Sequence, residues 1–69
     1  MMFTITMFQD EDGMFIVECP ALPGCVSQGT TDRESESNIR QAICECLAVR
    51  RELGLPVTTI EVRQLEVPI

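Results

Sequence analysis

Four cysteines are the residues of this 69-residue chain whose type could hold a metal ion or form a disulfide. Cys44 and Cys46 are two positions apart in a segment with helical periodicity, so their side chains should point about 200° apart. Cys19 and Cys25 are separated by a proline-rich turn, and the sequence contains no Cys-x-x-Cys knuckle. These spacings favour free thiols that pack as small apolar side chains, and they assign no chemical role to Cys19, Cys44 or Cys46. We therefore expect no metal and no cofactor.

Carboxylates are the other reactive groups, and they outnumber the cations. The chain has 11 Asp and Glu against 5 basic residues, a net charge of −6, and no histidine, tyrosine or tryptophan. Without histidine there is no imidazole for acid–base catalysis and no histidine-activated nucleophile. The negative charge should repel nucleic acid phosphates and attract a basic partner protein. The composition therefore favours a protein-binding domain over an enzyme or a direct nucleic acid binder.

Alternating apolar and polar residues predict the strands that position these groups. Residues 2–9 and 14–19 alternate with the two-residue period of half-buried strands, and the segment 10–13 supplies a hairpin connection. Leu22-Pro23-Gly24-Cys25 suits a type II turn because its glycine accepts a positive φ. A third short strand should follow over residues 25–28.

A helix is predicted over residues 32–53. Thr31 and Glu34 form a capping-box pattern, and apolar residues recur at helical spacing between them and Leu53. Gly54 and Pro56 then terminate the helix. The β-rich residues 57–67 predict a fourth strand that returns in parallel through a right-handed crossover, with a bulge near residues 63–64 where the alternation changes phase.

The predicted fold is a single α+β domain spanning residues 1–69, with the order β-β-β-α-β and a four-stranded mixed sheet that carries the helix on one face. If Phe8, Phe15 or Val17 lies on the other face, an apolar patch is exposed there. We therefore expect a homodimer or a higher homo-oligomer. The chain shows no apolar run long enough for a membrane span and no signal-peptide pattern, so a cytoplasmic location and no membrane partner are expected.

Several motifs together resemble the HicB-type antitoxin domain. They are Asp10-x-Asp12-Gly13, the continuous run of residues 18–29, Thr31-x-x-Glu34, and Asn38-Ile39-Arg40-x-Ala42-Ile43. The resemblance implies a partial RNase H-like fold and a partner, a small basic mRNA interferase toxin of the HicA type, that the domain blocks. Many members continue into a DNA-binding module that this chain lacks, so DNA binding is not carried over.

Two groups of site residues follow from the motifs and the charge pattern. The toxin-binding candidates are the carboxylates of Asp10, Glu11, Asp12 and Glu18, which could pair with basic side chains of the toxin; the alternative for the hairpin acids is a solvated loop tip. The motif residues to which we assign a structural role are Pro20, Leu22, Pro23, Gly24, Cys25 and Gly29.

Two other functions compete with the antitoxin interpretation. One is a stand-alone oligomeric adaptor or structural domain without a toxin partner. The other, suggested by the RNase H-like fold, is a metal-dependent nuclease, which needs several carboxylates around ions about 4 Å apart. The first predicted strand contains no acid. Glu61 and Glu66 on the last predicted strand therefore have no carboxylate on the first strand with which to share the metal ions. We expect no catalytic residues.

Overall fold

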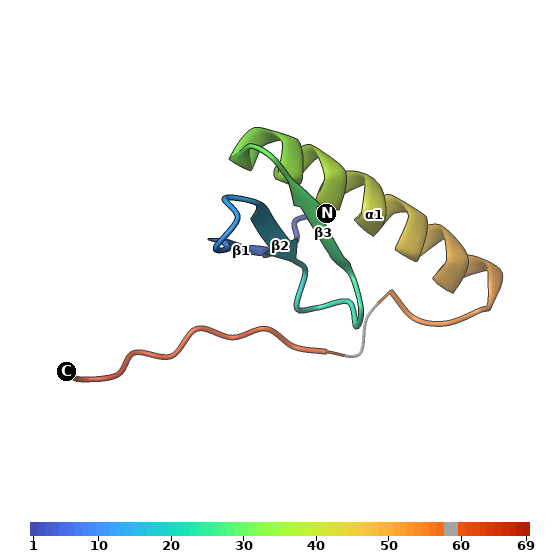
Figure 1. Ribbon diagram of the computed structural model, residues 1–69. Coiled ribbons are helices and arrows are strands. Elements are labelled where there is room, and N and C mark those ends of the chain that lie inside the picture. Colours follow the sequence, from blue (N-terminus) through green and yellow to red (C-terminus); the bar gives the residue numbers. More distant parts are fainter. Residues whose placement is uncertain (58–59) are drawn as a thin grey trace.

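The chain forms a three-stranded antiparallel sheet with one helix packed on one face, in a computed structural model that describes residues 1–57 and 60–69 (Figure 1). The elements, in chain order, are β1 (Thr6–Gln9), β2 (Phe15–Glu18), β3 (Val26–Gly29) and α1 (Asp32–Glu52). The strands are neighbours in the order β1-β2-β3. The predicted α+β class, the three-strand meander and the helix are therefore confirmed.

The register of the strands decides which side chains face the helix. Met7 lies opposite Val17, which in turn lies opposite Ser27. Val17 is completely buried against the helix, so this row faces α1. Because side chains alternate across a strand, Phe8 and Ile16 of the next row face the other side. Phe8 thus lies on the uncovered face, as anticipated, but Phe15 and Val17 do not.

The core lies between the sheet and the inner stripe of α1. Two of the four cysteines belong to it, which confirms that they pack as small apolar side chains. The buried apolar residues are Val17, Cys19, Leu22, Cys25, Ile39 and Ile43.

Both ends of α1 are capped as the sequence predicts. Thr31 is the N-cap, and its side chain accepts a hydrogen bond from the Glu34 backbone N–H at 3.0 Å. The Glu34 carboxylate reaches back to Thr30, accepting from both its backbone N–H and its hydroxyl. At the other end the Leu55 N–H donates to the Arg50 carbonyl, a bond that closes the last turn and ends the helix.

The predicted fourth strand is not shown. Residues 60–69, the C-terminal segment, form no strand and are all exposed, and they lead away from α1 and the sheet (Figure 1). Positions 58 and 59 of the predicted strand 57–67 lie outside the described residues. The predicted bulge at 63–64 is not observed, because residues 60–69 pair with no strand. The physical reason is that β-branched residues favour extended backbone, but a strand also requires an edge to pair with. The observed sheet is accordingly antiparallel and not mixed.

No helix within residues 1–57 and 60–69 is long and apolar enough to cross a bilayer.

Candidate protein-binding surface

The face of the sheet opposite α1, here called the open face, carries a compact group of apolar side chains. The strand register aligns two rows on it, Phe8–Ile16–Gln28 and Thr6–Glu18–Val26. Phe8 is 61% exposed and Val26 is 52% exposed, while Ile16, beside Phe8 in the first row, is half-buried. Exposed apolar side chains on one sheet face, here on both edge strands, mark an interaction surface.

Glu18 gives the open face its charge. It lies on the central strand β2, between Thr6 of β1 and Val26 of β3, and it is exposed. The first 32 residues contain no lysine or arginine, so the whole sheet lacks a cationic side chain. In the described part of the chain, side-chain ion pairs occur between Glu36 and Arg40 and between Glu61 and Arg63, and neither includes Glu18. The Glu18 carboxylate therefore faces solvent without an internal cation.

The acidic residues predicted at the hairpin tip have two different roles in the structure. One carboxylate oxygen of Asp10 accepts the backbone N–H groups of Asp12 and Met14, each at 2.9 Å, and Asp10 is partly buried. Asp10 therefore stabilises the loop. Its position in the sequence alone did not distinguish this role from binding to a partner protein. Glu11 and Asp12 are exposed and form the negative tip of the β1–β2 hairpin.

The proline-rich segment after β2 is a pair of turns that anchors the core. The Leu22 N–H donates to the Cys19 carbonyl, and the Cys25 N–H donates to the Leu22 carbonyl, both at 3.1 Å. Gly24 has a φ of 76°, which fits the predicted type II turn. Leu22 is 1% exposed, whereas Pro23 and Gly24 are exposed at the surface. These turns place Leu22 and Cys25 in the core, as the motif suggested.

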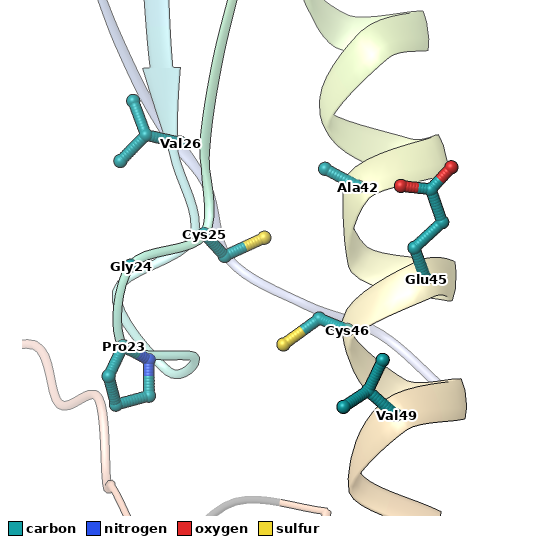
Figure 2. Close-up of a pocket in the computed structure, with 8 residues that line it drawn as sticks. All are labelled: Pro23, Gly24, Cys25, Val26, Ala42, Glu45, Cys46 and Val49. Atoms are coloured by element: carbon teal, nitrogen blue, oxygen red, sulfur yellow. The ribbon is translucent and has the colours of Figure 1, made fainter.

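A small groove of about 240 Å³ separates this turn from α1 (Figure 2). The thiols of Cys25 and Cys46 both point into it, while Val26 points away from the helix. Burial raises the pKa of the Cys25 thiol above its usual range, and the neighbouring Cys19 and Cys46 thiols raise it further. A thiol with a raised pKa is a weaker nucleophile at neutral pH, which fits the packing role of Cys25 in the core.

Two polar contacts that fix the helix on the sheet were missed by the sequence analysis. Ser35 is fully buried, and its hydroxyl donates to the Asp32 carbonyl at 2.8 Å while lying 3.8 Å from the Met7 sulfur. The Asn38 amide donates to the Gln28 carbonyl of β3 at 2.8 Å. Asn38 stood within a recognised motif, but nothing local in the sequence indicates what either side chain contacts.

No cluster of three or more His, Cys, Asp or Glu side chains suited to a metal ion occurs among residues 1–57 and 60–69. Glu61 and Glu66 lie in the C-terminal segment and are exposed. Asp10 accepts hydrogen bonds from the backbone of its own loop and lies on the β1–β2 hairpin.

These features define a small α+β domain with an uncovered, anionic sheet face, and similarity to known proteins places it in a family. The chain belongs to the UPF0150 family: it is 36% identical over 53 residues to a UPF0150 protein of Archaeoglobus fulgidus, a match that covers 77% of each chain. UPF0150 proteins of Thermoplasma acidophilum and Synechocystis are 49% identical over 43 residues and 47% identical over 45 residues. Those two matches span 62% and 65% of the relatives' own lengths. No family model and no solved structure matches the chain.

Proposed function

We propose that this chain is a HicB-like antitoxin-type domain that neutralises a small basic mRNA interferase by covering its RNA-binding surface. The observation that carries the proposal is the open face, where exposed Val26 lies beside Glu18 and exposed Phe8 lies in the next row, on a sheet without cations. The motif resemblance over residues 18–29 supports the same function. Membership of the UPF0150 family is compatible with it.

The physical basis of such inhibition is occlusion. An RNA-cleaving protein must present arginine or lysine side chains to bind phosphate, and these side chains are attracted to a surface of opposite charge. Glu18 offers an arginine a charge-assisted hydrogen bond, and the exposed tip residues Glu11 and Asp12 extend the negative field that steers the encounter. Phe8 and Val26 are 61% and 52% exposed, so covering them would contribute about half of the roughly 1.5–3 kcal/mol of a completely buried side chain. No bond needs to be made or broken by this chain.

The oligomeric adaptor is the competing function, and the same apolar side chains favour it. Phe8 and Val26 could be covered by another copy of the chain instead of a toxin. Glu18 distinguishes the two cases, because two copies that met face to face would bring like charges together. The charge of the open face therefore favours a cationic partner.

Co-expression tests the proposal directly. The chain is produced together with the product of an adjacent reading frame that encodes a small basic RNA-cleaving protein, and growth and co-purification are scored. We expect restored growth and a stable complex. Val26→Ser should weaken the complex, whereas Val49→Ser, which alters a side chain of similar exposure (53%) on α1, should not. Persistent growth arrest without a complex would rule the proposal out.

A further inference from the structure

A second apolar groove lies on the helix side of the sheet, between the N-terminal residues and α1. Its volume is about 610 Å³. The Glu36–Arg40 ion pair contributes to its wall, with the two charged groups 3.6 Å apart. The remaining lining residues are mostly apolar: Met1, Met2, Phe3, Ile5, Ile39, Ile43, Cys44 and Leu47. The N-terminal lining residues come directly before β1 in the chain, so the groove adjoins the start of that strand.

The edges of the sheet are not equivalent. In the described residues, β1 pairs with β2 alone, so its outer edge presents unpaired backbone groups next to the groove. At the opposite edge, the Asn38 amide of α1 already occupies the Gln28 carbonyl of β3. An extended peptide can add to an open edge through backbone hydrogen bonds, with alternate side chains entering the adjacent groove. The β1 edge therefore has the features of a strand-addition site.

The C-terminal segment has the composition of the missing strand. Leu65 and Val67 are 84% and 65% exposed, and residues 61–69 belong to no ladder. The turn that precedes the segment is fixed, because the Arg50 side chain donates to the Pro56 carbonyl at 2.8 Å. Figure 1 shows residues 60–69 leading away from α1, and none of them lines the groove of its own chain. A short fixed turn before an exposed strand-like segment favours exchange between copies.

We infer that the β1 edge and the adjoining groove bind the C-terminal segment of a second copy, so that two chains form a strand-exchanged dimer. The four-residue β1 spans about 13 Å, so a pairing stretch of about four residues from the segment is enough to match it. Each copy would cover one groove with the exposed apolar side chains Val62, Leu65 and Val67 of its partner's segment, and the two-fold symmetry would double that contact. Exchange also brings Arg63 towards a sheet that has no cation of its own.

The inference goes beyond the proposed function and does not depend on it. The groove lies on the helix side of the sheet, so a strand-exchanged dimer would leave Glu18 and the rest of the open face accessible. A negative result in the toxin co-expression experiment would not contradict the dimer, and a negative result in the dimer experiment would not contradict the proposed function.

Disulfide trapping tests the exchange, because Cys44 is an exposed thiol on the groove wall. Val62→Cys, Leu65→Cys and Val67→Cys are made singly and oxidised. A disulfide requires Cα atoms roughly 4.4–6.8 Å apart, so we expect a covalent dimer for at least one position. The same variant carrying Cys44→Ser should give none. Light scattering of the wild-type chain at micromolar concentration should give twice the 7.7 kDa chain mass.

Three results would overturn the inference. The first is a monomeric mass for the wild-type chain, which requires no variant to fold. The second is a disulfide that closes within one chain, seen as a faster-migrating monomer on a non-reducing gel; this would place the segment on its own groove. The third is covalent dimer that forms equally well with Cys44→Ser.

Discussion

At the scale of single residues, Gly29 shows why one motif position requires glycine. A Cβ atom added at Gly29 would lie 2.5 Å from the backbone nitrogen of Ser35, closer than real Cβ contacts. The end of β3 therefore touches the first turn of α1 directly. Sequence reasoning assigned Gly29 a structural role but could not give this cause, because the contact is tertiary and leaves no local pattern.

Gly29→Ala should destabilise the fold by about 1–3 kcal/mol, the usual cost of overpacking, because neither backbone can move away easily. Urea unfolding followed by circular dichroism measures the change. Gln28→Ala, which alters a neighbouring exposed side chain, is the control and should stay within about 0.5 kcal/mol. Equal midpoints for the two variants would show that the close approach is not maintained in solution.

The cysteines separate into accessible and protected thiols. Cys44 is exposed, whereas Cys19 and Cys25 are buried, so a thiol reagent should modify Cys44 first and reach the other two only on unfolding. Mass spectrometry after timed alkylation measures the order. Early modification of Cys25 would contradict its placement in the core.

The raised pKa of Cys25 also gives stability a pH dependence with a definite sign. The unfolded thiol ionises near its ordinary pKa of 9.0, and the folded thiol does so only at higher pH. The stabilising contribution is therefore complete below about pH 9 and is lost as the pH rises through the folded value. Unfolding midpoints should fall above pH 9, and less steeply for Cys25→Ala. Parallel profiles for the two proteins would remove Cys25 as the cause.

At the scale of elements, local patterns predicted what depends on local chemistry. The cap at Thr31, the turn at Gly24 and the alternation in the first strands lead directly to the observed elements. The predicted fourth strand is not observed, because β-propensity does not specify the strand edge or the chain with which a segment pairs. The strand with which this segment pairs depends on tertiary or intermolecular contacts, and the alternation of apolar residues carries no information about them.

Thr31→Ala tests the contribution of the helix cap. Loss of the hydroxyl that accepts the Glu34 N–H should cost about 1 kcal/mol and lower the melting temperature by about 4–8 °C in a domain of this size. Thermal unfolding by circular dichroism measures the shift. Ser37→Ala, at an exposed position within α1, serves as the control and should leave the melting temperature nearly unchanged. An equal shift in both variants would argue against the cap.

At the scale of the whole molecule, charge and secondary structure are divided along the chain. The strands carry one acid, Glu18, and no base, and every arginine lies in α1 or the C-terminal segment. The sequence predicted an anionic domain with one uncovered sheet face, and the structure adds that Glu18 occupies that face while Asp10 serves the hairpin. Because the arginines lie outside the sheet, the open face is the surface best suited to bind a cationic side chain.

Charge reversal at Glu18 tests this account most directly. The affinity of the basic toxin is measured by titration calorimetry for the wild-type chain, for Glu18→Arg, and for Glu52→Arg, which makes the same change at an exposed site in the last turn of α1. We predict that Glu18→Arg weakens binding at least tenfold and that the loss shrinks at high salt, while Glu52→Arg has little effect. Equal affinities for the two variants would contradict the account.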